Sequence, residues 1–251
     1  MKASGNTILI TGGGTGIGLA LAARFLRAGN EVIICGRRLE KLREAQRQYP
    51  QLHVYQCDLS QESARGVLFE KVTHDFPKLN VLLNNAGMWV STRLDRAESW
   101  PEARQQLETN LAATIHLTQL FAQHLSRQFA PVVFVTTSGL AHTPRAAASV
   151  YCATKAALHS YTQSLRFQLR NTAVQVIEIM PPGVQTGLRD ERVNEPDAMP
   201  LDEYIAETMA LLTEEPEATE IVVDATKPLR FAERDGVYEQ RYTDFNTSRS
   251  P

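Results

Sequence analysis

Six short apolar runs, separated by helical patterns, most strongly restrict the folds open to this chain of 251 residues. Each run is short enough to be a strand. Several are apolar on consecutive residues, as expected for parallel strands buried on both faces. The predicted strands are Thr7–Ile10, Glu31–Cys35, Leu52–Gln56, Asn80–Leu83, Val132–Thr136 and Val174–Ile179.

Helical patterns fill the intervals. In the first, Ile17, Leu21 and Phe25 share one face, and Gly29-Asn30 is a stop signal. The other predicted helices are Leu39–Gln48, Glu62–Asp75, Glu102–Gln128, Val150–Arg170, Leu201–Leu212 and Pro216–Arg234. This alternation predicts an α/β fold, a Rossmann-type doubly wound parallel sheet with helices on both faces. It has six strands, or seven if the C-terminal region supplies another.

We expect residues 1–251 to form a single domain. Within residues 187–241, Gly187–Pro200 is polar with two prolines and predicts a loop or short helix that closes over a site, followed by C-terminal helices. The tail Tyr242–Pro251 has little apolar surface to bury, so we expect it to be disordered.

The overall composition excludes several classes of protein. A net charge of −2 predicts no general affinity for nucleic acid or an anionic membrane. The three cysteines are far apart and lack metal-ligand spacing, so we expect reduced thiols and no metal site. No apolar stretch approaches the roughly 18 residues of a membrane span, and no signal peptide is recognisable, so we expect a cytoplasmic protein.

A glycine-rich loop, Thr11-Gly12-Gly13-Gly14-Thr15-Gly16-Ile17-Gly18, follows the first predicted strand. Ligands of open parallel sheets bind beyond the carboxyl ends of the strands. Glycines permit positive φ and close approach, and the following helix N-terminus offers free N–H groups to a phosphate. We therefore expect Gly12, Thr15, Gly16, Ile17 and Gly18 to bind a dinucleotide. A glycine-rich turn without a ligand is the alternative.

Two arginines, Arg37 and Arg38, follow the second strand, and no carboxylate appears before Glu40. Proteins that bind NAD place an acidic residue near this point to hold the ribose 2′-hydroxyl. Guanidinium groups instead suit bidentate contact with a 2′-phosphate. The pattern favours NADP(H) over NAD(H), with Arg37 the better candidate. A solvated basic start to the second helix is the alternative.

The third and fourth strands end in polar residues with two possible uses each. Asp58, beside Leu59, can accept a hydrogen bond from an adenine amino group or cap the helix from Ser60 onward. The segment Asn84-Asn85-Ala86-Gly87 can satisfy loose backbone groups or contact a ribose. Sequence alone leaves both alternatives open.

Further polar and rigid residues follow the last two strands. Ser138 follows the fifth strand, and Pro181, Val184 and Thr186 lie in a rigid turn suited to line a nicotinamide pocket. Tyr151 and Lys155 have i, i+4 spacing at the start of a helix, so both lie on one face. A nearby ammonium favours the phenolate and lowers the tyrosine pKa from about 10, which suits general acid/base catalysis.

With these motifs in this order, the sequence resembles the short-chain dehydrogenase/reductase family, in its branch of this chain length, and its ending is similar to a bacterial subgroup of oxidoreductases. The resemblance covers residues 5–190. It rests on the glycine loop, Asn84-Asn85-Ala86-Gly87, Asn110, Ser138 and Tyr151-x-x-x-Lys155, with Ser138 thirteen residues before Tyr151.

The resemblance implies a role for each matching residue. Tyr151 is the expected proton donor or acceptor, and Ser138 the group that holds the substrate oxygen. Lys155 is expected to hold the nicotinamide ribose and lower the tyrosine pKa, and Asn110 to help hold a water that relays protons. Together with Tyr151 and Lys155, the expected cofactor-binding residues include Asp58, Leu59, Asn85, Ala86, Gly87, Pro181, Val184 and Thr186.

Two departures from the family pattern have consequences. Pro181-Pro182 replaces the usual Pro-Gly pair, which predicts a locally changed pocket. The unusual C-terminal sequence argues that a seventh strand is short or absent. Because members of the family commonly pair through the two long helices, the resemblance then implies a homodimer with Leu117, Leu120 and Phe121 in the contact, and a homotetramer is the alternative. The other possibility for this apolar face is that it packs only on its own sheet.

The leading hypothesis is therefore an NADP(H)-dependent oxidoreductase that transfers a hydride between nicotinamide and a carbonyl or secondary alcohol carbon of a small molecule. A non-catalytic NADP(H)-binding sensor is the alternative. An epimerase or dehydratase acting on nucleotide sugars is disfavoured, because such enzymes need a larger C-terminal region.

Overall fold

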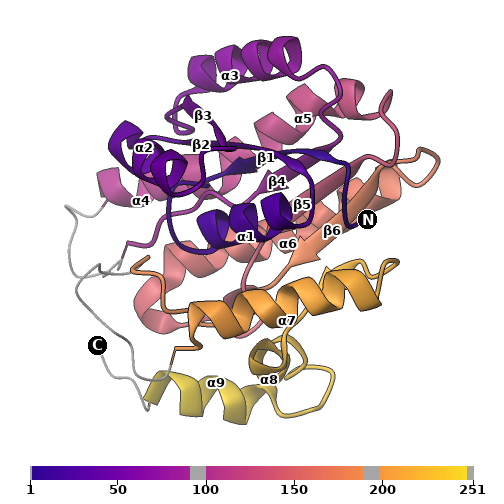
Figure 1. The fold of residues 1–251 in the computed structure, drawn as a ribbon. Helices are drawn as coiled ribbons and strands as arrows, with labels where there is room; N and C mark the ends of the chain where they lie inside the picture. The colour runs from indigo at the N-terminus through magenta and orange to yellow at the C-terminus, as the bar shows by residue number, and fades with distance from the viewer. Residues whose placement is uncertain (1, 91–99, 189–197, 248–251) are drawn as a thin grey trace.

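The computed structural model describes residues 2–90, 100–188 and 198–247, and its centre is one parallel sheet (Figure 1). The strand order is β3-β2-β1-β4-β5-β6-β7, which confirms the doubly wound α/β fold and supplies a seventh strand. The strands are β1 Thr7–Thr11, β2 Glu31–Gly36, β3 His53–Gln56, β4 Val81–Asn84, β5 Val132–Thr136, β6 Gln175–Ile179 and β7 Glu220–Ile221.

Helices cover both faces of the sheet, and alternate strand residues supply two separate cores. In β1, Ile8 and Ile10 belong to the core beneath α1, α2 and α7, whereas Leu9 faces α3, α5 and α6. This arrangement explains the continuous apolar runs of the inner strands β1, β4 and β5, which are buried along their whole length, whereas the edge strand β3 is exposed or partly buried. The helices are α1 Gly16–Arg27, α2 Leu39–Gln48, α3 Glu62–Asp75, α4 Trp100–Leu107, α5 Ala113–Leu125, α6 Ser149–Gln168, α7 Leu201–Glu214, α8 Lys227–Arg230 and α9 Tyr238–Thr247.

The predicted helix Pro216–Arg234 is wrong over most of its length. Glu220–Ile221 forms β7, paired in parallel with Glu178 and Ile179 of β6, and only Lys227–Arg230 is α-helical. Ile221 and Val223 are buried at the sheet edge, and such β-branched residues suit a strand. Pro228 lies in the first turn of α8, where a missing N–H costs nothing, and does not kink a longer helix.

The expected long helix Glu102–Gln128 is divided into three segments. It consists of α4, a π-helical turn Glu108–Ala112, and α5, which ends at Leu125. A π-helical turn inserts an extra residue into the helix, and such turns often occur at functional sites. Here the turn contains Asn110, whose side chain is fully buried.

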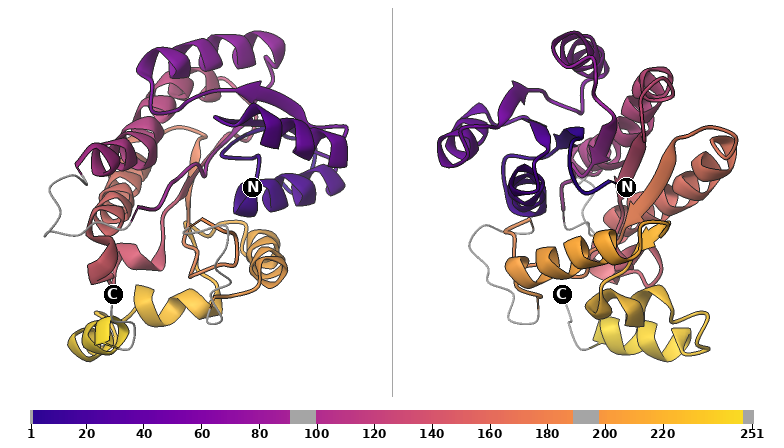
Figure 2. Two further views of the ribbon diagram at one scale, coloured as in Figure 1. Left: turned by 90° about the vertical axis from the view of Figure 1, so that its left-hand side faces the viewer. Right: turned by 45° about the vertical axis from the view of Figure 1, so that its right-hand side comes forward.

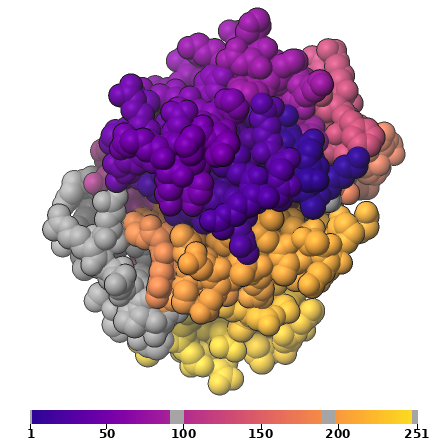
Figure 3. Space-filling model, viewed as in Figure 1, coloured from indigo at the N-terminus to yellow at the C-terminus, as the bar shows by residue number. Residues whose placement is uncertain are grey.

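The C-terminal tail is more ordered than we expected. Tyr242 to Thr247 belong to α9. Asn246 Oδ1 accepts a hydrogen bond from Ala146 N at 2.7 Å, and Phe245 packs against a buried cluster that includes Tyr151. In Figures 2 and 3 the orange and yellow segment, α7 to α9, lies together on one side of the molecule. The prediction of a disordered tail from Tyr242 is therefore wrong for these residues, because they dock onto the loop before α6.

The apolar face of α5 packs on its own sheet. Leu117 and Phe121 are buried in the core of this chain, and Leu120 is partly buried against it. Leu117 and Phe121 are four residues apart and so face the sheet together. They cannot form the symmetric contact that we expected of them.

The first testable prediction concerns Gly18 at the start of α1. A Cβ there would lie 2.4 Å from Gly12 O and 2.6 Å from Asn85 Nδ2, so helix and loops approach too closely for alanine. We expect Gly18→Ala to lower the free energy of unfolding by about 1–3 kcal/mol, measured by chemical denaturation. In the control Gly66→Ala nothing lies within 4 Å of the added Cβ, and the helix should gain about 0.5–1 kcal/mol. Equal stability of the two variants would contradict the prediction.

Candidate active site

A cavity of about 1550 Å³ lies at the carboxyl edge of the sheet. Loops after several strands surround it, because parallel strands bring all their carboxyl ends to the same edge. The sequence-predicted residues that line it are Gly12, Thr15, Gly16, Ile17, Arg37, Arg38, Leu59, Asn85, Ala86, Gly87, Ser138, Tyr151, Lys155, Pro181, Val184 and Thr186.

The glycine loop forms one end of this cavity. Gly12 and Gly16 have φ of +65° and +56°, values that side chains rarely allow. A Cβ on Gly12 would also lie 2.9 Å from the backbone of Ala86. Gly16 and Ile17 begin α1 and border the cavity, so the helix N-terminus is turned toward it. This cradle fits a phosphate group held by backbone N–H groups.

Hydrogen bonds join the loops after β1 and β4. Thr11 Oγ1 accepts from the backbone N–H groups of Asn85 and Ala86, each at 3.0 Å, and Asn85 Nδ2 donates to Thr11 O at 3.0 Å. Asn84 is buried and donates to Thr118 Oγ1. The Asn85 side chain therefore satisfies a backbone group and borders the cavity. Asn84 does not line the cavity, and its side chain contacts Thr118 of α5.

The two arginines after β2 lie beside the glycine loop. Arg37 and Arg38 are exposed and line the cavity, and Arg38 Nη2 lies 3.5 Å from Thr15 Oγ1. Lys41 lines the same region, a residue that our sequence reasoning did not include. Three cationic side chains therefore border the part of the cavity nearest β2, where anionic groups are favoured.

Asp58 and Gly18 do not line the cavity. Asp58 Oδ1 accepts hydrogen bonds from Ser60 N at 3.0 Å and Ser60 Oγ at 2.8 Å, which fixes the turn before α3. These contacts agree with the alternative that Asp58 stabilises the start of the following helix, although α3 begins only at Glu62. Gly18 serves the close packing of α1 on the loops.

Asn110 lies behind the cavity. Its Oδ1 accepts from Met88 N at 2.8 Å, and its Nδ2 donates to Met88 O at 3.0 Å. The side-chain amide therefore holds the chain that leaves β4. A role for Asn110 in holding water stays a prediction.

Tyr151, Lys155 and Ser138 all line the cavity. Tyr151 and Lys155 lie in the first two turns of α6, and the Lys155 Nζ is 5.6 Å from the centre of the Tyr151 ring. Lys155 Nζ donates to Thr136 O, at the end of β5, at 2.7 Å. Ser138 lies two residues further along, and its Oγ accepts from Leu140 N. The end of β5 thus connects the predicted lysine and serine.

Lys155 is nearly completely buried. Burial lowers the pKa of Lys155 to about 8, and the negative charge of Glu178 opposes that shift. The ammonium group is therefore still largely charged near neutral pH, next to the tyrosine that it is expected to activate.

Apolar side chains form the wall beside Tyr151. The centre of the Trp89 ring lies 4.6 Å from the centre of the Tyr151 ring, and Met88 and Leu140 also line the cavity. Of the expected lid, residues 189–197 lie outside the described residues. The chain after these residues returns to the turn that follows β6, because Met199 N donates to Gly183 O at 2.8 Å.

The C-terminal region contributes residues that sequence reasoning missed. Leu229, Arg241 and Phe245 line the cavity. A signal was present: Tyr238, Tyr242 and Phe245 recur at helical spacing, which predicts an amphipathic helix. The polar residues between them led us to expect disorder instead.

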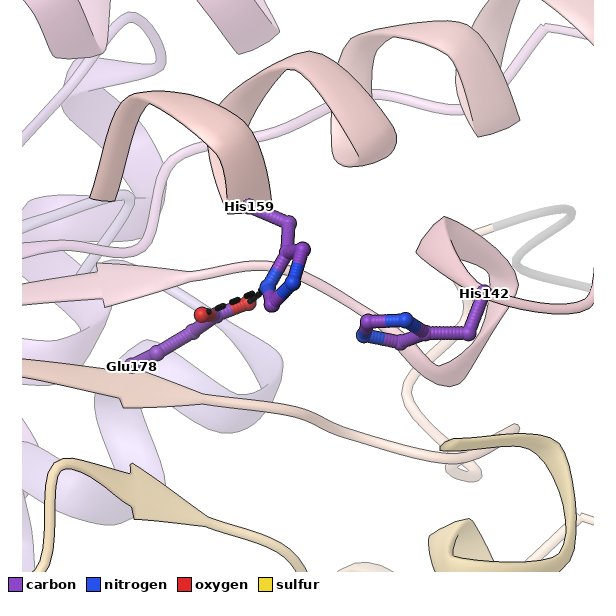
Figure 4. Close-up of side chains that lie close together, drawn as sticks. All are labelled: His142, His159 and Glu178. Carbon is purple, nitrogen blue, oxygen red and sulfur yellow. Dashed lines mark hydrogen bonds and ion pairs between the residues drawn. The ribbon is translucent and has the colours of Figure 1, made fainter. Parts of the chain in front are cut away.

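A second group of polar residues lies behind the cavity: His142, His159 and Glu178 (Figure 4). Their ligand-type atoms all lie within 4.8 Å of one another, although we expected no metal site. His159 Nδ1 lies 3.0 and 2.9 Å from the two Glu178 oxygens, and the His142 ring meets the His159 ring edge-on at 4.4 Å. His142 does not line the main cavity, and it is partly buried in the turn after Ala141.

The fold and this cavity define a Rossmann-type, nucleotide-binding protein. The family model of the short chain dehydrogenases matches residues 6–197, and the chain belongs to this family of oxidoreductases. The resemblance inferred from the motifs is thereby confirmed.

Relatives and solved structures agree with this assignment. The chain is 43% identical over 254 residues to an uncharacterized oxidoreductase, DltE, of Bacillus subtilis, covering 98% of this chain and 100% of the relative. It is 32% identical over 181 residues to a serine 3-dehydrogenase of Agrobacterium fabrum, covering 72% of each. A short-chain dehydrogenase from Burkholderia cenocepacia in complex with NADP superposes with a TM-score of 0.77 at 25% identity, covering 90% of this chain and 98% of that one.

Among the described residues, no helix has the length and apolar character needed to cross a membrane.

The second testable prediction concerns His142. Burial lowers its pKa to about 4, and the positive charges of Arg230 and His159 act in the same direction. An unfolded histidine titrates near 6.5, so protons favour the unfolded chain between about pH 6.5 and 4, and stability falls as pH falls through this window.

In this window we expect His142→Asn to reduce the slope of the free energy of unfolding against pH, by up to about 1.4 kcal/mol per pH unit. Urea denaturation at several pH values measures this slope. The exposed His53, changed to Asn, is the matched control and should leave most of the slope in place. An unchanged slope in His142→Asn would show that this residue does not titrate as the structure implies.

Proposed function

We propose that this protein is an NADP(H)-dependent oxidoreductase that transfers a hydride between nicotinamide and a carbonyl or secondary alcohol carbon, with Tyr151 as general acid and base. The observation that carries the proposal is the buried contact of Lys155 Nζ with Thr136 O, which places an ammonium group between Tyr151 and the end of β5. Ser138 follows on the same segment and borders the same cavity.

The cavity has the features that a dinucleotide requires. The positive-φ glycines leave room for a diphosphate at the α1 N-terminus, and the arginines after β2 suit a 2′-phosphate. The NADP complex of the Burkholderia cenocepacia relative supports the same preference. When bound, NADP(H) supplies or accepts the hydride.

Residues of this chain transfer the proton and bind the substrate oxygen. Tyr151 protonates the oxygen in reduction and removes its proton in oxidation, and Ser138 holds that oxygen by a hydrogen bond. The Lys155 ammonium stabilises the phenolate form of Tyr151. Apolar side chains, Trp89 and Leu140 among them, exclude water from the reacting carbon.

We also propose that the chain forms a single domain and acts in the cytoplasm as a homodimer, with a homotetramer as the alternative. The pairing of family members through their long helices supports a dimer. Its contact would use outward-facing residues of α5 and α6, since Leu117 and Phe121 are buried within the chain.

The third testable prediction is the loss of turnover in Tyr151→Phe. Removal of the phenolic hydroxyl should lower kcat by at least about 100-fold, because no group remains to transfer the proton, whereas NADPH binding should be nearly unchanged. Turnover is measured as NADPH consumption with a panel of carbonyl compounds.

Tyr161→Phe, ten residues further along α6, is the matched control and should retain activity. Activity that survives in Tyr151→Phe would make the tyrosine assignment wrong. Tight NADPH binding with no consumption by the native protein would favour the non-catalytic sensor.

The fourth testable prediction concerns cofactor choice. We expect Arg37→Ala to weaken NADPH binding by about 10- to 100-fold, since a charge-assisted hydrogen bond contributes about 1.5–3 kcal/mol, with little effect on NADH. Titration of each variant with both cofactors measures this difference. Arg43→Ala removes a cation from α2, the helix that follows Arg37, at a position outside the cavity, and should change neither affinity. Equal loss of NADPH and NADH affinity would contradict a 2′-phosphate site.

A further inference from the structure

Glu178 is a charged side chain buried in the sheet, an arrangement that requires a reason. It lies in β6 with 0% of its surface exposed. Burial of a carboxylate costs several kcal/mol unless hydrogen bonds and opposite charges compensate for lost water. Val176 of the same strand faces α5 and α6, and alternation of side chains places Glu178 on that face too.

Two side chains satisfy the Glu178 carboxylate. Thr137 Oγ1 donates to Oε1 at 2.6 Å, and His159 Nδ1 lies 3.0 Å from Oε1 and 2.9 Å from Oε2 (Figure 4 shows the contact with His159). His159 belongs to α6, one turn beyond Lys155. The carboxylate therefore joins β6, the segment after β5 and the helix that contains the expected catalytic tyrosine and lysine.

The contact with Thr137 has a direct consequence for the site. Thr137 lies between Thr136, whose carbonyl oxygen accepts from Lys155, and Ser138. Its backbone N–H also donates to Ile179 O at 2.8 Å. Glu178 and its neighbour Ile179 thus hold Thr137 by both side chain and backbone, and with it the two residues that meet Lys155 and the substrate oxygen.

Other charged groups surround this carboxylate. Lys155, His159 and Arg166 come from α6, and His142, which its lowered pKa keeps neutral near pH 7, comes from the loop after β5. On the β7 side, Glu220 is the register partner of Glu178, and its charge is paired with Arg230 at 3.0 Å. Lys155 differs from these groups because it is both fully buried and expected to be catalytic.

From this geometry we propose that Glu178 is a positioning residue of the active site. Through Thr137 it fixes the Thr136–Ser138 segment, and it supplies a buried negative charge at α6, where it contacts His159 one turn beyond Lys155. The inference rests on the proposed function for its catalytic meaning, but the effect on Lys155 is measurable without turnover.

The fifth testable prediction is a shift in the titration of Lys155. Loss of the negative charge in Glu178→Gln disfavours the ammonium, so the midpoint of Lys155, near pH 8 in the native protein, should fall by about one pH unit or more. The lysine ε-methylene signal in ¹H–¹³C NMR reports this midpoint in a Tyr151→Phe background, where the tyrosine does not interfere. Lys155→Arg identifies the signal by its loss.

Glu220→Gln is the matched control. It removes a carboxylate at the neighbouring register position, where Arg230 already pairs with it, and should move the Lys155 midpoint much less. An unchanged midpoint in Glu178→Gln, or an equal shift in both variants, would overturn the electrostatic part of the inference.

Thr137 tests the positioning part separately. Thr137→Val keeps the Glu178 charge and loses the hydrogen bond, so kcat should fall about tenfold while the Lys155 midpoint stays within a few tenths of a pH unit. Thr137→Ser restores the hydroxyl and should recover most of kcat. A native kcat in Thr137→Val would overturn this part. The Thr137→Val measurement also decides the inference if Glu178→Gln does not fold.

The two proposals fail in different ways. If the native protein consumes no NADPH with any carbonyl compound, the proposed function is wrong, and the Lys155 titration still tests the charge contact. If the native protein is active and neither titration nor kcat responds, the role of Glu178 is wrong and the proposed function stands.

Discussion

The hydrogen bond from Lys155 Nζ to Thr136 O is the contact on which the rest of the site depends. It links the first turns of α6 to the carboxyl end of β5, in a region with little water. Burial lowers the pKa of Lys155 to about 8, and the nearby Glu178 charge opposes the loss of the proton. A charge in such surroundings acts strongly on its neighbours, because the local dielectric constant is lower than that of water. The position of α6 on the sheet therefore sets the chemistry available to Tyr151.

Much of the fold followed from local sequence patterns. The first six strands lie within a residue of the predicted bounds at each end. The signal was strongest for the inner strands, because strands buried on both faces must be apolar on consecutive residues. The seventh strand is present and short, one of the two outcomes expected, but the helix predicted across it and the disorder predicted for α9 were wrong for the opposite reason. Glu220–Ile221 is too short to form a pattern, and α9 is a polar helix held by Asn246 and Phe245 against residues about a hundred positions earlier.

The candidate site was predictable to a similar degree. Parallel strands bring their carboxyl ends to one edge of the sheet. The polar and charged residues that follow the strands, such as Arg37 and Ser138, therefore had to lie near the same edge. Spacing along the chain says nothing about which side-chain atoms make contact. The sequence did not indicate that the Asn110 amide holds the Met88 backbone from within a π-helical turn.

The sequence by itself determined the fold class, the glycine loop, the basic residues after β2 and the pairing of Tyr151 with Lys155. All of these depend on residue type and short-range spacing. Only the tertiary structure decided that Glu178 lies behind the active site with Thr137 and His159, and that α9 forms part of the cavity wall. Such contacts join distant parts of the chain, and their energies depend on burial, which no local pattern of residues specifies.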